Sequence, residues 1–198
     1  MDWDSILQDV SWFHFSAIAP ALSPSAAALC KEALEEASKR NITISIDLNY
    51  RSLLWNYGTK PIDIMPTLIQ YCNVIMGNIW SARILAGTQS NLNEQDNATF
   101  EEYVELAAAT ATELFANNPC CTYVANTFRF HQDDQSVTYY GVLNTRIEQA
   151  VSPIYSTPTI IDKVGSGDCF MAGLIYGITN QHKSSDIISF AAAAADRK

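Results

Sequence analysis

Ile160–Gly177 reads IIDKVGSGDCFMAGLIYG. The segment begins apolar, turns at Gly165-Ser166-Gly167, and continues with apolar residues spaced as on one face of a helix. The two glycines permit positive φ angles and leave the backbone amides accessible to a ligand. Because free N–H groups at a helix start attract negative charge, the segment predicts a turn that binds an anion.

Asp168 falls in the first turn of this expected helix, where two interpretations are open. Its carboxylate can accept a proton from a substrate hydroxyl while the neighbouring amides hold a phosphate. It can also serve as an ordinary helix cap that satisfies the orphan amides. A Walker A loop is excluded because no Gly-Lys-Ser/Thr follows at the required spacing.

The same segment resembles the C-terminal signature of the ribokinase-like (PfkB) carbohydrate kinases. That signature is Asp-Thr-x-Gly-Ala-Gly-Asp-x-Phe with a later Gly, and residues 162–170 together with Gly173 match it. Two positions depart from the signature, since Lys163 replaces the usual Thr and Ser166 replaces the usual Ala. The match is long and position-specific, so it carries more weight than a short glycine motif.

The resemblance implies roles for the turn and for the carboxylate that follows it. Asp168 would be the general base on a sugar hydroxyl and would contact the substrate. The amides of Gly165, Ser166 and Gly167 would neutralise charge on the phosphoryl group that moves from ATP. Gly165 and Gly167 would thereby also contribute to nucleotide binding.

A βαβ unit is expected at the start of the chain. Residues 12–15 form an aromatic run that predicts a buried strand, and Ser23 with Pro24 predicts a helix start. That helix would extend to about Arg40 and lead into a strand over residues 42–47. This order and length favour parallel strands.

Polar residues follow the second of these strands, where open α/β sheets bind ligands. Asp47-Leu-Asn49-Tyr-Arg51 resembles the Asp-x-Asn-x-Arg segment of the same family, especially its 2-keto-3-deoxygluconate kinase branch. The resemblance implies that Arg51 binds the carboxylate of an acid sugar and that Asn49 contributes to the substrate site. A solvated loop in which Asp47 acts as a cap is the alternative.

Asn78 follows a short strand expected at residues 73–76 and precedes a helix expected from Ile79, so it is a plausible helix cap. The family has Asn-x-x-Glu here, near magnesium and phosphates, whereas this chain has Ser81 at the Glu position. The resemblance therefore implies a nucleotide contact for Asn78 and no protein ligand for the metal. ATP and Mg²⁺ are the expected cofactors, with Mg²⁺ held through water and phosphates.

The remaining patterns complete an α/β fold with three layers. Helices are expected near residues 64–71, 99–116 and 184–198, and strands at 122–130 and 137–143 predict an antiparallel hairpin. We expect a mostly parallel sheet flanked by helices, ribokinase-like but incomplete, with this hairpin at its edge. Residues 1–198 would form a single partial kinase domain.

Composition excludes several classes of protein. The chain carries 21 acidic and 12 basic residues, a net charge of −9, and offers no basic stripe for nucleic acid. No apolar run reaches the roughly 20 residues of a membrane span. Five cysteines without a CxxC pair favour reduced thiols in a cytoplasmic protein. The expected partners are a small sugar acid and ATP, and a homo-oligomer is an open alternative.

The resemblance maps to the middle and later part of a family member. Early strands, a lid and a glycine motif are expected before Trp3, and the elements that enclose the adenine are expected after Lys198. We therefore expect a fragment with little or no activity of its own, from a kinase that phosphorylates 2-keto-3-deoxygluconate at its 6-position. The alternatives are a kinase for a neutral sugar such as fructose or ribose, a non-catalytic nucleotide- or sugar-binding domain, and a structural cap on an unrelated sheet.

Overall fold

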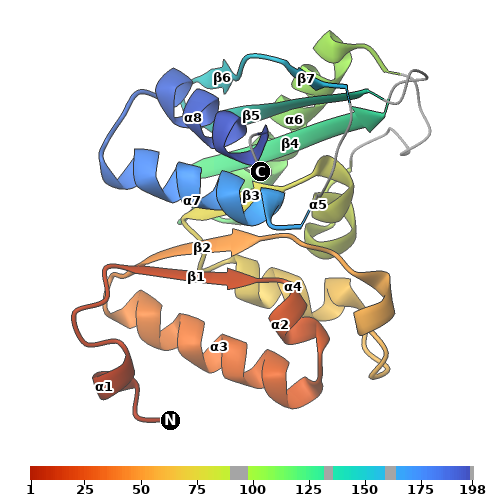
Figure 1. Cartoon of the computed structure of the whole chain (residues 1–198). Helices are drawn as coiled ribbons and strands as arrows, with labels where there is room; N and C mark the ends of the chain where they lie inside the picture. Colours follow the sequence, from red (N-terminus) through yellow and green to blue (C-terminus); the bar gives the residue numbers. More distant parts are fainter. Residues whose placement is uncertain (90–97, 132–135, 159–163, 197–198) are drawn as a thin grey trace.

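The computed structural model describes residues 1–89, 98–131, 136–158 and 164–196. Within these residues, seven strands form one sheet in the order β1-β2-β3-β4-β5-β6, with β7 also paired to β5 (Figure 1). The strands are β1 (Trp12–Ser16), β2 (Thr43–Asp47), β3 (Val74–Gly77), β4 (Tyr123–His131), β5 (Val137–Thr145), β6 (Gln149–Val151) and β7 (Tyr155–Thr157). The helices are α1 (Trp3–Ile6), α2 (Ile18–Ala21), α3 (Pro24–Lys39), the 3₁₀ turn η1 (Ser52–Leu54), α4 (Pro61–Ile69), α5 (Ile79–Ala86), α6 (Phe100–Asn117), α7 (Ser166–Thr179) and α8 (Ser184–Asp196).

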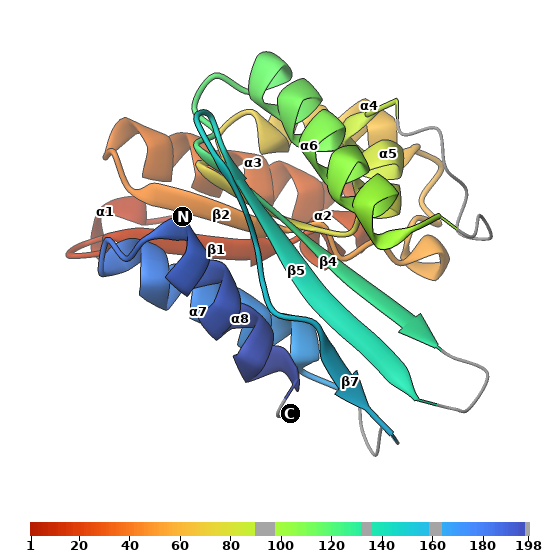
Figure 2. The same cartoon turned by 90° about the horizontal axis from the view of Figure 1, so that it is seen from above.

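Strands β1 to β4 are parallel, and β5, β6 and β7 add an antiparallel part. Helices α3 to α6 cover one face of the sheet, and α7 with α8 cover the other (Figure 2). The predicted three-layer α/β fold, with a mostly parallel sheet flanked by helices and an antiparallel hairpin, is confirmed. The antiparallel part is wider than the sequence indicated, because β6 and β7 have only three residues each and leave little periodicity to detect.

Local signals explain where the helices begin. Ser23 accepts a hydrogen bond from the Ala26 amide at the start of α3, and Pro24 occupies the first helical position. Thr99 and Glu102 cap the start of α6 reciprocally. These caps satisfy amides that have no partner inside the helix, so the helix limits follow from a few neighbouring residues.

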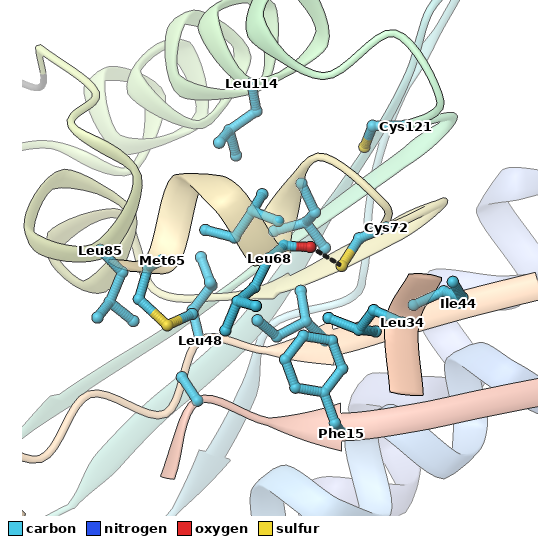
Figure 3. Packing of buried hydrophobic residues seen from close by; sticks show 14 of the residues in the cluster. Phe15, Leu34, Ile44, Leu48, Met65, Leu68, Cys72, Leu85, Leu114 and Cys121 are labelled. Carbon is cyan, nitrogen blue, oxygen red and sulfur yellow. Dashed lines mark hydrogen bonds between the residues drawn. The ribbon is translucent and has the colours of Figure 1, made fainter. Parts of the chain in front are cut away.

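The larger core lies between the sheet and helices α3 to α6. It joins Phe15 of β1, Leu34 of α3, Leu68 of α4 and Leu114 of α6 (Figure 3). On the opposite face, α7 and α8 pack against β3, β4 and β5. A Cβ added at Gly173 of α7 would lie 2.6 Å from the Ala191 Cα of α8, so only glycine permits this close approach.

The aromatic run of β1 is less buried than predicted. Phe15 is buried, but Trp12 and Phe13 are half-buried and His14 is exposed. The reason is the position of β1 at one end of the sheet order, where it has a single neighbouring strand. Trp12 donates to the Ser45 hydroxyl, and the Nδ1 atom of His14 lies 2.8 Å from the same oxygen.

No helix in the described part of the chain combines the length and the apolar character needed to cross a membrane.

Candidate active site

A cavity of about 670 Å³ lies where β2, β3 and β4 end and α7 begins. The parallel register brings Asp47 of β2 opposite Met76 of β3, and Gly77 of β3 opposite Asn126 of β4. The cavity is lined by Asp47, Leu48, Asn49, Tyr50, Arg51, Met76, Gly77, Asn78, Trp80, Ser81, Thr127, Arg129, Tyr139, Val164, Gly165, Ser166, Gly167 and Asp168. All the site residues predicted from the sequence are therefore brought together, while their roles stay predictions.

The glycine turn begins α7 without a side-chain cap. Gly165 is the N-cap residue of α7, with a φ of 82°, and no side chain caps the helix there. The Cys169 amide donates to the Gly165 carbonyl at 2.9 Å, which closes the first helical turn. The amides that precede it in the first turn have no acceptor within the helix itself, as at any helix start. The turn can therefore offer N–H groups to an anion in the cavity.

Asp168 lies in the first turn of α7, and its side chain is exposed toward the cavity. The interpretation of Asp168 as the helix cap is wrong, because Gly165 occupies the cap position and makes no side-chain bond. A carboxylate at this place can meet a hydroxyl that enters the cavity. Lys163, where the sequence departs from the family signature, lies outside the described residues.

Asp47 supplies a second carboxyl group close to the first turn of α7. A Cβ added at Gly167 would lie 3.9 Å from the Asp47 Oδ2 atom. The pKa of Asp47 is raised from 3.8 to about 6, chiefly by burial and then by the negative charge of Asp168, while the positive charge of Arg51 acts in the opposite direction. A solvated cap, which was the alternative for Asp47, would not have this environment. The sequence placed Asp47 in a family segment but gave no sign that its carboxyl reaches α7.

The raised pKa of Asp47 predicts a pH-dependent gain in stability for the Asp47→Asn variant. Between pH 3.8 and about 6 the folded state binds more protons than the unfolded state, so wild-type stability falls as pH rises through this window. An amide carries no such penalty. We expect Asp47→Asn to gain about 1–2 kcal/mol relative to wild type between pH 4 and pH 7.5.

Denaturant unfolding of the purified chain at the two pH values measures this gain. Asp9→Asn is the matched control, because Asp9 is exposed and lies outside the cavity. Its stability relative to wild type should be the same at both pH values. A pH-independent difference for Asp47→Asn as well would show that Asp47 is not a buried charge.

The 3₁₀ turn η1 begins directly after Arg51, which occupies the position before its first residue. The Arg51 side chain is exposed, and its guanidinium donates to the Tyr50 carbonyl at 3.3 Å. Asn49 is half-buried two residues earlier, also on the cavity wall. The guanidinium is therefore available to a ligand on the β2 side of the cavity.

Asn78 caps α5, as its side chain accepts a hydrogen bond from the Ser81 amide at 2.7 Å. The capping prediction is thus confirmed, and a contact from Asn78 to a nucleotide remains a prediction. Ser81 is 7% exposed and lines the same wall. Within the described residues, no cluster of three or more His, Cys, Asp or Glu side chains could hold a metal ion. This donor set fits Mg²⁺ that is carried mainly by phosphates and water.

Arg129 at the end of β4 was missed from the sequence. Its guanidinium donates to the Ser166 hydroxyl at 2.6 Å, so a strand on one side of the cavity is joined to the glycine turn. A signal was present, since an arginine between Phe128 and Phe130 is unusual in an apolar strand. Pattern alone could not say what the arginine would reach.

Comparison with known proteins gives the same assignment for nearly the whole chain. A family model described as pfkB family carbohydrate kinase matches residues 2–196. The chain belongs to the pfkB family of carbohydrate kinases. The turn at the start of α7, which has no side-chain cap, suits a phosphate group.

Relatives of this pfkB chain include proteins that act on keto-deoxy sugar acids. It is 26% identical over 193 residues to a 2-dehydro-3-deoxygalactonokinase of Haloferax volcanii, covering 98% of this chain and 52% of that protein. A 2-dehydro-3-deoxygluconokinase structure from Thermotoga maritima is similar with a TM-score of 0.83 at 28% identity, covering 100% of this chain and 56% of that one. A Xylella fastidiosa fructokinase with bound ATP shares the fold at 19% identity, with a TM-score of 0.67 and coverages of 97% and 55%. The chain thus spans about half the length of these relatives.

Proposed function

We propose that the protein containing this chain transfers a phosphoryl group from ATP to a hydroxyl of a 2-keto-3-deoxy sugar acid. The favoured substrate is 2-keto-3-deoxygluconate, which would be phosphorylated at its 6-hydroxyl. One observation carries the proposal: a carboxylate, an uncapped amide turn and an exposed guanidinium line the same cavity. The names of two relatives, which concern keto-deoxy sugar acids, support the substrate class.

The proposed reaction assigns a separate task to each part of the cavity. Asp168 takes the proton of the attacking hydroxyl as the new oxygen–phosphorus bond forms. The bond between the γ-phosphorus and the bridging oxygen breaks, and ADP leaves with the electron pair. The N–H groups of Gly165, Ser166 and Gly167 stabilise the charge on the moving group. When bound, Mg²⁺ supplies further charge neutralisation at the phosphates.

Arg51 is the proposed determinant of substrate class. A guanidinium can bind a carboxylate through two parallel charge-assisted hydrogen bonds, which a neutral sugar cannot accept in the same way. Because Arg51 also lowers the pKa of Asp47, it already acts on charge inside the cavity. Asn49 on the same segment is the proposed second substrate contact.

A comparison of acid and neutral sugars tests the proposal. ADP formation is measured with ATP, Mg²⁺ and either 2-keto-3-deoxygluconate, fructose or ribose, and the product is identified by ³¹P NMR. The assay is run on this chain and on the longest natural polypeptide that contains it. We expect the longer polypeptide to favour the acid sugar in kcat/KM by about tenfold or more. The 198-residue chain alone should show little turnover.

Two results would contradict the proposal. Faster turnover of fructose or ribose would favour a neutral-sugar kinase. ATP binding without ADP formation from any of the three sugars would favour a non-catalytic binding domain.

A further inference from the structure

We propose that Arg129 binds a phosphate group of the nucleotide at the Gly165–Gly167 turn. The inference rests on the proposed function for the nature of the nucleotide. The placement, the contacts and the charge of the Arg129 side chain support the phosphate contact itself.

The placement follows from the alternation of side chains along β4. Ala125 of β4 packs in the core beneath α7 and α8, whereas Phe128 packs in the cluster on the α6 side. Arg129 has the parity of Ala125 and therefore points to the face that α7 covers. It stands near the end of the strand, so its guanidinium reaches the cavity at the start of α7.

Two contacts hold the guanidinium in place before any ligand arrives. It donates to the Ser166 hydroxyl at 2.6 Å, and it lies 5.1 Å from the ring centre of Tyr139. Tyr139 is directly opposite Arg129 in the antiparallel register of β4 and β5, so the ring is a fixed support. An arginine side chain ordered in advance loses less conformational entropy when a ligand binds.

The charge of Arg129 is not neutralised by a carboxylate within the part of the chain that the structure describes, because none of the ion pairs found there includes it. The chain as a whole carries a net charge of −9, so the guanidinium groups of Arg51 and Arg129 on the cavity wall contrast with the overall charge of the chain. A guanidinium beside amides that offer N–H groups is suited to phosphate, which accepts its parallel donors. Arg51 also lines the cavity, but it lies on a different segment of the chain and is assigned to the sugar carboxylate.

Ser166 connects this feature to the departure from the family signature. The signature has Ala at this position, and a methyl group cannot accept a hydrogen bond. In this chain the Ser166 hydroxyl accepts from Arg129 and retains its own proton to donate. Ser166 and Arg129 thus act as a pair that adds a fixed positive charge to the amide turn.

Binding of three probes to purified protein tests the assignment. ATP, inorganic tripolyphosphate and adenosine are titrated into wild type, Arg129→Met, Ser166→Ala and Arg83→Met by calorimetry. Arg83→Met is the matched control, since Arg83 is exposed on α5 and does not line the cavity. Thermal unfolding without ligand checks that each variant folds.

We expect Arg129→Met to weaken the affinity for ATP and for tripolyphosphate by about tenfold or more and to leave the affinity for adenosine unchanged. Ser166→Ala should weaken the affinity for ATP and for tripolyphosphate about threefold or more, because it only releases the guanidinium. If Arg129→Met does not fold, Ser166→Ala is the variant that decides. Arg83→Met should stay within about twofold of wild type, because screening weakens distant surface charges.

Equal affinities in Arg129→Met and Arg83→Met would overturn the inference, and so would equal losses of ATP and adenosine, which indicate a purely structural role. If Ser166→Ala folds but Arg129→Met does not, an unchanged affinity of Ser166→Ala for tripolyphosphate overturns the inference. Binding of tripolyphosphate that depends on Arg129, without binding of ATP, would contradict the kinase proposal but support this inference. Binding of neither phosphate by wild type would overturn both.

Discussion

Asp168→Asn is expected to lower kcat for sugar phosphorylation by about 10²–10⁴-fold, the range that general-base catalysis contributes. The amide has nearly the shape of the carboxylate but cannot take the hydroxyl proton. ATP affinity should be unchanged or slightly tighter, because a negative charge beside the phosphates has been removed. ADP release and ATP binding are both measured in the longest natural polypeptide that contains this chain.

Asp186→Asn is the control for this experiment. Asp186 is exposed in the first turn of α8, so its substitution makes the same chemical change at the same helical position without touching the cavity. Its kcat should equal that of wild type. Normal turnover in Asp168→Asn would remove Asp168 from the role of base, whatever the sugar.

Arg51→Met is expected to raise KM for 2-keto-3-deoxygluconate by about 30–100-fold and to change KM for a neutral sugar by less than about threefold. The asymmetry arises because only the acid sugar would lose charge-assisted hydrogen bonds, and each factor of ten corresponds to about 1.4 kcal/mol. Because kcat should change much less than KM, steady-state kinetics on the two sugars separate binding from chemistry.

Lys60→Met is the control for the loss of one positive charge. Lys60 is exposed before the first residue of α4 and does not line the cavity. Its KM values should match those of wild type for both sugars. Equal increases for acid and neutral sugars in Arg51→Met would argue that Arg51 shapes the cavity wall rather than binding a carboxylate.

Two departures from the family pattern, Ser166 and Ser81, lie on the cavity wall. Ser166, in place of Ala, accepts a hydrogen bond from Arg129. Ser81, in place of Glu, donates its amide to the cap residue Asn78 and leaves the wall without that carboxylate. The absence of the Glu carboxylate makes the cavity less negative than the family pattern implies, which favours a site for anions.

Local chemistry made several elements predictable. The Ser23-Pro24 start of α3 and the reciprocal cap at Thr99 depend on residues within four positions of each other, so a sequence pattern contains all the information. Strands β6 and β7 were missed because three residues each leave too little periodicity to detect. The exposure of His14 was missed for a different reason, since the place of β1 in the sheet order is not a local property.

By itself the sequence determined the glycine turn before α7, the carboxylate in its first turn and the guanidinium after β2, because each lies within a short motif. Only the tertiary structure decided that Asp47 faces Gly167 and that Arg129 reaches Ser166. Those contacts join residues far apart in sequence, the second pair by 37 positions. The direction of a side chain at a strand end depends on strand order, register and the helix packed above it, and these arise only when the sheet assembles.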